Sequence, residues 1–161
     1  MKYFLIKSEP NTRIVKGIDV KFSIKDLKKD VKTTWDGVRN FEARNIIQEM
    51  KVGDLCLFYH SNCKVPGIAG LAKVVKNPYA DHTAFDSSHY HYDPKSDINK
   101  PTWFMVDVEF VCEFDRFLTL KELQAEPSLK NMPLLVRSRL SVQRVDKSFF
   151  DVIMKMQETK N

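Results

Sequence analysis

The sequence predicts an α+β fold, in which apolar strands are mixed with short capped helices. Residues 3–6 are apolar without a break, and residues 55–60 are apolar until their end at His60, which is typical of strands buried on both faces. Residues 103–114 alternate between apolar and polar side chains, which predicts a long half-buried strand. Between such segments, helix-capping residues precede short helical patterns at Ser23, Asn40, Thr119 and Asp146.

Composition predicts one domain, which we place at residues 1–157, with residues 158–161 as a frayed tail. With 161 residues, 43% hydrophobic and 29% charged, the chain can bury a core without cross-links. The three cysteines have no framework spacing, and no apolar run reaches signal-peptide or membrane-spanning length. We therefore expect an intracellular protein with no membrane partner. The net charge of +5 is compatible with a polyanionic partner.

The first strand, residues 3–6, ends in the polar sequence Lys7-Ser8-Glu9-Pro10. A buried strand that ends this way forms a rim where ligands often sit, although the same pattern fits an ordinary solvated strand exit. The next element is a helix from a capping box at Ser23 to about Asp30.

Residues 34–40 have neither a strand nor a helix period, and they combine chemistry suited to a recognition loop. Trp35 offers a flat aromatic face, Asp36 accepts hydrogen bonds and Arg39 can bind a phosphate. The alternative is a core aromatic followed by an Asp-Gly turn. Asn40 should cap a helix that runs to about Met50, which would give Arg39 a helix N-terminus as its neighbour.

The strand at residues 55–60 emerges at His60-Ser61-Asn62, which forms a second polar rim. Residues 68–75 make the next strand and should pair with it as a hairpin, with Gly67 and Gly70 marking a bulge or a close backbone approach. Residues 76–102 have no sustained period but are rich in Tyr and His. We predict a long loop that either forms a lid over a pocket or packs on its own aromatics.

After the strand at 103–114, a capping box at Thr119 predicts a helix that ends near Pro127. If residues 134–144 are extended, Arg137, Arg139, Ser141 and Gln143 share one face. Such a row suits a phosphate backbone, and it also fits the wet side of an edge strand. A last helix follows Asp146, with an apolar core stripe at Phe149, Val152, Ile153 and Met156.

Enzyme signatures are sparse. The chain has no phosphate-cradling glycine loop, dinucleotide fingerprint or nucleophile elbow. Cys56, His60 and Cys63 could approach one point, but they lack a fourth ligand and a paired spacing, so we expect no metal and no cofactor. Glu9 and Asp36 could form an acid and base pair if they face one pocket, which keeps an enzyme open as an alternative.

Several multi-residue motifs occur in the order and spacing of the EVE domain. They are Tyr3 to Pro10, Trp35 to Asn40, Phe58 to Asn62, Pro66 to Gly70, Asp81 to Thr83, His91 to Pro94 and Trp103 to Val108. The resemblance covers nearly the whole chain. It implies a PUA-like fold, a bent mixed β-barrel flanked by short helices, and kinship with the YTH domain, which reads N6-methyladenine in RNA. It also implies a pocket for a modified base, with modified cytosine in DNA as the proposed ligand.

Within this resemblance, Trp35 is similar to the first aromatic wall of the YTH cage, and Lys7-Ser8 to the polar end of its first strand. No second cage tryptophan matches, because Trp103 lies in the strand of the family's structural tryptophan, so the second wall would come from Tyr59, Phe85, Tyr90 or Tyr92. The predicted base pocket contains Ser8, Glu9, Trp35, Asp36, Gly37, Val38, Asn40, Tyr59, His60, Ser61 and Asn62. The predicted phosphate contacts are Lys7, Arg39, Lys64, Arg137, Ser138 and Arg139.

The resulting hypothesis is a non-catalytic reader that binds a flipped modified base, 5-methylcytosine or 5-hydroxymethylcytosine, in nucleic acid. The alternatives are an enzyme that acts on modified nucleotides through Glu9 and Asp36, and a protein-interaction module. The sequence leaves the choice between DNA and RNA, the modification and the oligomeric state open. A nuclear location is implied by the resemblance alone.

Overall fold

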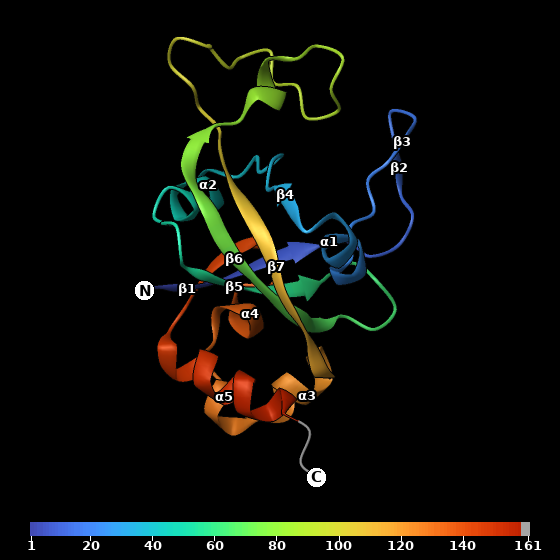
Figure 1. Ribbon diagram of the computed structural model, residues 1–161, viewed down its shortest axis with the longest axis vertical. Helices are drawn as coiled ribbons and strands as arrows, with labels where there is room; N and C mark the ends of the chain where they lie inside the picture. Colours follow the sequence, from blue (N-terminus) through green and yellow to red (C-terminus); the bar gives the residue numbers. More distant parts are fainter. Residues whose placement is uncertain (159–161) are drawn as a thin grey trace.

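The computed structural model describes residues 1–158, and it contains one six-stranded sheet with the order β4-β7-β6-β5-β1-β8 (Figure 1). β1 is parallel to β5, whereas all other neighbours in the sheet are antiparallel. A separate two-stranded hairpin, β2–β3, projects from the body. The strands are β1 (Tyr3–Ser8), β2 (Ile14–Val15), β3 (Ile18–Asp19), β4 (Lys32–Thr34), β5 (Leu55–His60), β6 (Gly67–Ala80), β7 (Phe104–Thr119) and β8 (Val142–Val145).

The helices are short, and side-chain caps start most of them. Ser23 and Thr119 each form the predicted capping box, and the side chains of Asn40 and Asp146 cap α2 and α5. The helices are α1 (Ile24–Asp30), α2 (Phe41–Ile47), α3 (Leu120–Ala125), α4 (Pro133–Val136) and α5 (Lys147–Gln157), with 3-10 turns η1 (His82–Phe85) and η2 (Pro127–Leu129). The mixture of one sheet with short helices confirms the α+β prediction. The predicted frayed tail falls mainly on residues 159–161, which lie outside the described residues.

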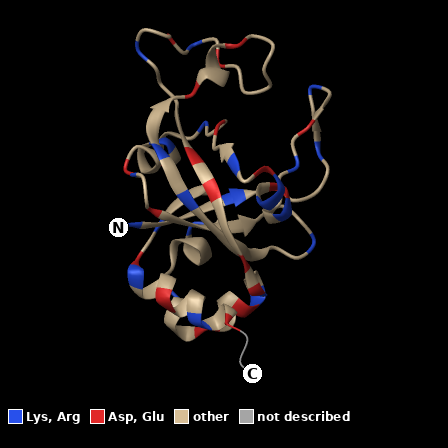
Figure 2. Cartoon of the chain, viewed as in Figure 1, with Lys and Arg blue, Asp and Glu red and all other residues tan. Residues whose placement is uncertain are grey.

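The sheet has a core on each face, which explains why its central strands are continuously apolar. Phe4 and Ile6 pack on one side with α1 and α2, whereas Leu5 and Leu57 pack on the other side with α3, α4 and α5. In Figure 1 the later helices gather at one end of the molecule, while β6 and β7 reach toward the other end. Acidic and basic residues are interspersed over all of these elements (Figure 2).

The glycines at the start of β6 permit a close backbone approach, as predicted. A Cβ added to Gly67 would lie 2.2 Å from the Leu118 carbonyl oxygen, and one added to Gly70 would lie 2.4 Å from that of Cys112. The register between β6 and β7 shifts between Ile68 and Gly70. The missing side chains therefore let β6 and β7 approach closely at this register shift.

Several boundaries differ from the predictions. β6 and β7 are longer than expected, while α2 ends at Ile47 instead of Met50. Phe41, the first residue of α2, is 60% exposed and packs on Trp103, with ring centroids 5.0 Å apart. β4 and the β2–β3 hairpin were not predicted, because their strands have only two or three residues and carry no clear apolar period.

The predicted extended row from Arg137 to Gln143 is wrong. Pro133 opens the short helix α4, the chain then turns, and β8 begins only at Val142. Gln143 is fully buried, and its amide donates hydrogen bonds to the carbonyl oxygens of Arg137 and Leu140 at 3.1 and 3.0 Å. This amide holds residues 137–140 in a turn and leaves Gln143 facing inward.

Candidate functional site

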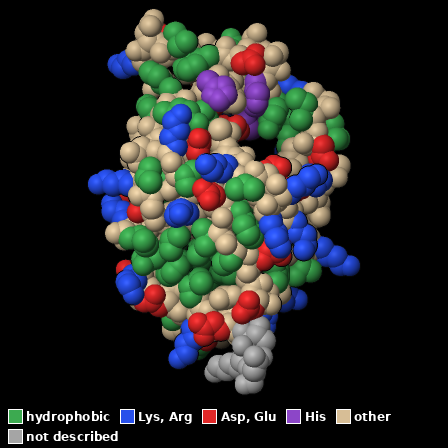
Figure 3. Space-filling model, in the orientation of Figure 1, with side chains coloured by type: hydrophobic (Ala, Val, Ile, Leu, Met, Phe, Trp, Pro, Cys, Tyr) green, Lys and Arg blue, Asp and Glu red, His purple; other side chains and the backbone are tan. Residues whose placement is uncertain are grey.

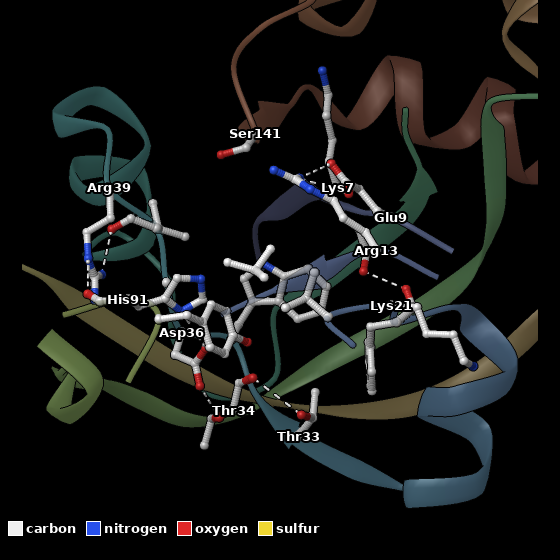
Figure 4. A pocket seen from close by; sticks show the side chains of 18 of the residues that line it. Lys7, Glu9, Arg13, Lys21, Thr33, Thr34, Asp36, Arg39, His91 and Ser141 are labelled. Atoms are coloured by element: carbon white, nitrogen blue, oxygen red, sulfur yellow. Dashed lines mark hydrogen bonds and ion pairs between the residues drawn. The ribbon is translucent and has the colours of Figure 1, made fainter. Parts of the chain in front are cut away.

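A cavity of about 620 Å³ opens beside the end of β1, and segments distant in sequence line it. In the space-filling view the surface is hollowed between the β2–β3 hairpin and histidine side chains (Figure 3). The lining residues are Lys7, Ser8, Glu9, Arg13, Val15, Asp19, Val20, Lys21, Phe22, the run 33–39, Tyr90, His91 and Ser141. The two predicted features, the rim after the first strand and the Trp35 loop, thus lie on one cavity (Figure 4).

Trp35 follows directly after β4, and its position is set by both backbone and side-chain contacts. The backbone N–H of Trp35 donates to the Val106 carbonyl oxygen at 2.8 Å, which continues the pairing of β4 with β7. The ring is half-buried and meets Phe58 and Phe22 edge-on, with centroids 5.7 and 6.3 Å apart. These aromatic edges hold the indole, which forms an aromatic wall of the cavity.

The loop after Trp35 is anchored by Asp81, a fully buried carboxylate at the end of β6. Asp81 Oδ2 accepts hydrogen bonds from Gly37 N at 2.8 Å and from Arg39 Nη1 at 2.9 Å. Its Oδ1 accepts from the Thr83 amide and hydroxyl at 2.9 and 2.5 Å. Burial raises the pKa of Asp81, but the bonds from Thr83, Gly37 and Arg39 outweigh it and leave the pKa below its ordinary value.

Arg39 uses its whole guanidinium inside the protein. Its N–H groups donate to Asp81, to the Thr83 hydroxyl and to the carbonyl oxygens of His91 and Val38, at 2.8 to 3.2 Å. Five bonds match the five N–H donors of arginine, so no donor remains for a phosphate. The side-chain oxygen of Asn40 caps α2 by accepting a hydrogen bond from Ala43 N at 2.9 Å. The geometry therefore gives a structural role to the guanidinium of Arg39 and to the side-chain oxygen of Asn40.

Gly37 and His91 join the loop to the long segment after η1. Gly37 has a φ of +79°, and a Cβ at this position would lie 2.0 Å from the His91 ring. His91 Nδ1 lies 3.5 Å from Asp36 Oδ1, and Asp36 Oδ2 accepts from the Thr34 hydroxyl at 2.9 Å. Position 37 requires glycine for two reasons. The positive φ disfavours other residues, and the imidazole of His91 occupies the space that a Cβ would fill.

The long segment fits both sequence interpretations, because it packs on its own aromatics and also lines the cavity. Tyr90 stacks on His89 with ring centroids 4.4 Å apart, and Tyr90 and His91 reach the cavity. Of the four candidates for a second aromatic wall, Tyr90 lines this cavity, whereas Phe85 and Tyr92 are not among its lining residues.

The opposite side of the cavity is formed by the end of β1. Ser8 Oγ donates to the Phe22 carbonyl at 2.5 Å, so this hydroxyl serves the fold. Glu9 accepts from Arg13 at 2.9 and 3.0 Å and from Asn62 Nδ2 at 3.2 Å. Lys7 Nζ donates to the Ser138 carbonyl at 2.6 Å, and burial lowers the pKa of Lys7.

The carboxylates of the enzyme alternative share the cavity but lie on opposite sides of it (Figure 4). Each already accepts hydrogen bonds, Glu9 from Arg13 and Asn62, and Asp36 from Thr34. An acid and base pair needs two groups that meet around one reacting atom. This arrangement is better suited to fixed hydrogen-bond acceptors.

Other predicted residues lie in two neighbouring cavities or outside all three. Tyr59, Ser61 and Asn62 line a cavity of about 610 Å³ that shares Lys7, Glu9 and Ser141 with the first. Ser138 and Arg139 line this cavity too, and also a smaller one of about 390 Å³ together with Asn40 and Arg137. Arg137 pairs with Glu42, and its Nη2 donates to both carboxylate oxygens at 2.9 and 2.8 Å.

His60 and Lys64 do not line these cavities. His60 Nε2 accepts a hydrogen bond from Ile24 N at 3.1 Å, and burial lowers the pKa of His60. This imidazole therefore helps to seat α1, while Lys64 is exposed in the turn after β5. Among residues 1–158, no group of three His, Cys, Asp or Glu side chains could hold a metal ion.

The anchoring role of Asp81 and the contribution of the β2–β3 hairpin to the cavity were not predicted from the sequence. Arg13, Lys21 and Phe22 flank or follow the hairpin and line the cavity. A local signal for Asp81 exists, since an Asp two residues before a Thr amide commonly caps a turn. Its bonds to Gly37 and Arg39, however, span more than 40 residues and leave no pattern in the sequence.

Comparison with known proteins identifies the family, because the model of the EVE domain matches residues 2–156. The chain belongs to the EVE domain family. This EVE domain is 51% identical to human thymocyte nuclear protein 1 over 166 residues, which cover 97% of this chain and 74% of the relative. No helix within residues 1–158 is both long and apolar enough to cross a membrane.

Two solved structures extend the comparison. The crystal structure of human THYN1 in complex with 5-methylcytosine-containing DNA superposes with a TM-score of 0.95 and 48% identity, and covers 100% of both chains. The YTH domain of Zygosaccharomyces rouxii MRB1, in complex with N6-methyladenosine RNA, reaches a TM-score of 0.55 at 16% identity, covering 99% of this chain and 86% of that one. The second likeness concerns the fold alone, and it agrees with the predicted PUA-like architecture of the EVE domain.

Proposed function

We propose that this protein is a non-catalytic reader that binds a flipped, modified cytosine of DNA in the cavity beside Trp35. The observation that carries the proposal is this aromatic-walled cavity in a chain that shares 48% identity, over its whole length, with THYN1 as crystallised with 5-methylcytosine-containing DNA. Its volume of about 620 Å³ lies within the range of about 300–1,000 Å³ typical of small-molecule sites.

The bound base would stack on Trp35 and present its hydrogen-bonding edge to the loop. Extruding a base from a duplex costs a few kcal/mol, and stacking on an aromatic side chain returns roughly 1–3 kcal/mol. The Asp36 carboxylate lines the same cavity and accepts hydrogen bonds, which suits the exocyclic amine of cytosine. Asp81 supports this reader indirectly, because it fixes the backbone of Gly37 and the side chain of Arg39.

Discrimination for the methyl or hydroxymethyl group should be modest, since one carbon in an apolar slot is worth about 1–3 kcal/mol. Most of the affinity would come from phosphate contacts, which weaken as salt rises. Lys7, Arg139 and, beside the hairpin, Arg13 and Lys21 line the cavity and its neighbour and are the candidate contacts. We also propose a nuclear location, as in the name of the thymocyte nuclear protein relatives.

The proposal predicts that Trp35→Ala loses the preference for modified over plain DNA. The loss of stacking should weaken binding of the modified strand by about tenfold or more. The measurement is a competition titration with matched DNA and RNA oligonucleotides that carry cytosine, 5-methylcytosine, 5-hydroxymethylcytosine, adenine or N6-methyladenine, at two salt concentrations. Trp35→Phe, which keeps an aromatic face, should retain part of the preference.

Phe41→Ala is the matched control, because Phe41 is an exposed aromatic outside the cavity. Its preference should equal that of the wild type. An unchanged preference in Trp35→Ala would remove Trp35 from the pocket. Turnover of a modified nucleotide that Glu9→Gln or Asp36→Asn eliminates would instead favour the enzyme. Absence of any oligonucleotide binding at low salt would favour a protein-interaction module.

A further inference from the structure

The β2–β3 hairpin exposes apolar side chains on both of its faces. Ile14 is 62% exposed and Ile18 is 48% exposed. Ile14 pairs with Asp19, while Ile18 pairs with Val15, so the two isoleucines point to opposite faces of the ribbon. A surface ribbon that merely packed on the body would be apolar on one face only. This hairpin is suited to insertion between two apolar layers.

The base of the hairpin is firmly tied to the molecule, and its turn is well defined. Asp19 Oδ1 accepts from Arg13 N and Lys21 N, both at 3.1 Å, and Val20 N donates to the Arg13 carbonyl at 2.9 Å. Lys16 and Gly17 both have positive φ, 48° and 81°, as in the tight turns that match the twist of a two-residue hairpin. The hairpin can therefore hold its tip in a fixed place relative to the cavity.

The hairpin stands at the mouth of the cavity and brings positive charge with it. Val15 and Asp19 line the cavity, as do Arg13 and Lys21 at the two ends of the hairpin. Lys16 adds a third cation at the tip. Figure 2 shows basic residues on both arms, and Figure 3 shows the hairpin separated from the histidines by the hollow. Exposed isoleucines on the arms, with cations at the turn and at both ends of the hairpin, match a stack of bases flanked by phosphates.

We propose that the hairpin inserts Ile14 and Ile18 into duplex DNA, at the gap left when the modified base enters the Trp35 cavity. This inference rests on the proposed reader function and adds to it a residue set for duplex recognition. DNA-binding proteins that bend the duplex frequently insert apolar side chains, isoleucine among them, between base steps. Arg13, Lys16 and Lys21 contact the phosphates on either side of the gap, and Trp35 holds the extruded base.

The test compares the double variant Ile14→Ser/Ile18→Ser with the wild type on two ligands, a duplex with one 5-methylcytosine and the same strand alone, each also prepared with plain cytosine. Only the duplex has a gap to fill, so its affinity should fall about tenfold while single-strand affinity stays unchanged. The matched control is Val52→Ser, because Val52 is 57% exposed in the turn before β5, outside the cavity. It should change neither affinity.

Two outcomes would overturn the wedge: no loss on the duplex, or an equal loss on both ligands. The second outcome would mean a general contact or a damaged fold, and thermal unfolding of the variant separates these causes. Failure of the reader function gives a different result, in which the wild type shows no preference for 5-methylcytosine on either ligand. In that case Trp35→Ala would also leave both affinities unchanged, and the result would refute both the reader function and the insertion of the hairpin.

Discussion

The two sides of the cavity are held in different ways. The Trp35 loop is anchored by the carboxylate of Asp81, which is fully buried and accepts four hydrogen bonds. The opposite side is held by partly exposed pairs, such as Glu9 with Arg13. A buried network is costly to disturb and fixes a geometry, whereas exposed pairs contribute little and can exchange partners. In the proposed reader, the first side would set the shape for the base and the second would adapt to the nucleic-acid backbone.

The largest effect is expected from Asp81→Asn, which keeps the size of the side chain and removes its charge. The guanidinium of Arg39 then loses its partner in a half-buried position, so the free energy of unfolding should fall by about 3 kcal/mol. Urea unfolding measures it. Glu9→Gln weakens the partly exposed pair with Arg13 on the opposite side and should cost less than about 1 kcal/mol. Equal costs for the two variants would refute the contrast.

Acid should produce the next-largest effect, because protonation removes the same charge from Asp81. The pKa of this carboxyl is lowered in the folded protein, so its contribution is complete above the pKa in the unfolded chain, about 4. The contribution is lost as the pH falls through the lower, folded-state pKa. The difference in unfolding free energy between wild type and Asp81→Asn should therefore be constant above that pH and shrink below it. A constant difference down to pH 2 would contradict the assignment.

A smaller loss, about 2 kcal/mol, is expected from Gly37→Ala, which combines backbone strain with a collision against His91. Gly53→Ala is the control, since Gly53 has a φ of +99° and nothing within 4 Å of the added Cβ. It should show the strain alone. Adding His91→Ala to Gly37→Ala should recover the steric part only. If both glycine variants lose the same stability in thermal unfolding, the contact with His91 carries no weight.

The smallest effect is expected from the exposed arginines that line the two neighbouring cavities, Arg137 and Arg139. Arg139 is exposed and makes no ion pair with other described residues, so it is available to phosphate. Arg139→Gln should reduce the slope of log affinity against log salt by about 1 and leave base preference intact. Arg137→Gln should change the slope less, because Glu42 competes for that guanidinium. A change in base preference would place Arg139 in the pocket instead.

Features that depend on a few neighbouring residues were predictable from the sequence. The boxes at Ser23 and Thr119 and the cap at Asp146 involve atoms two or three residues apart, and the structure contains all of them. The apolar runs of β1 and β5 predicted strands buried on both faces, and these strands do separate two cores. Their polar ends then predicted the neighbourhood of the cavity.

Features set by distant partners were not predictable in this way. β4 consists of Lys32, Thr33 and Thr34, and only the free edge of β7 makes it a strand. The row from Arg137 to Gln143 has the alternation of a strand, but the buried amide of Gln143 draws the preceding carbonyls into a turn. Arg39 has a guanidinium suited to binding phosphate, yet this group is paired with Asp81 inside the protein. In each case tertiary contacts overrode a local pattern.

The position of β1 in the sheet has a consequence for biosynthesis. Tyr3 pairs with Leu55 on one side and with Val145 on the other, so the first strand made receives its second neighbour almost last. Pairings of such long sequence separation form slowly, and a nascent chain exposes the open edge meanwhile. Ser141, which lines the cavity, precedes β8 by one residue and arrives at the same moment. The sheet, and with it the Ser141 side of the cavity, is therefore complete only after β8 has been synthesised.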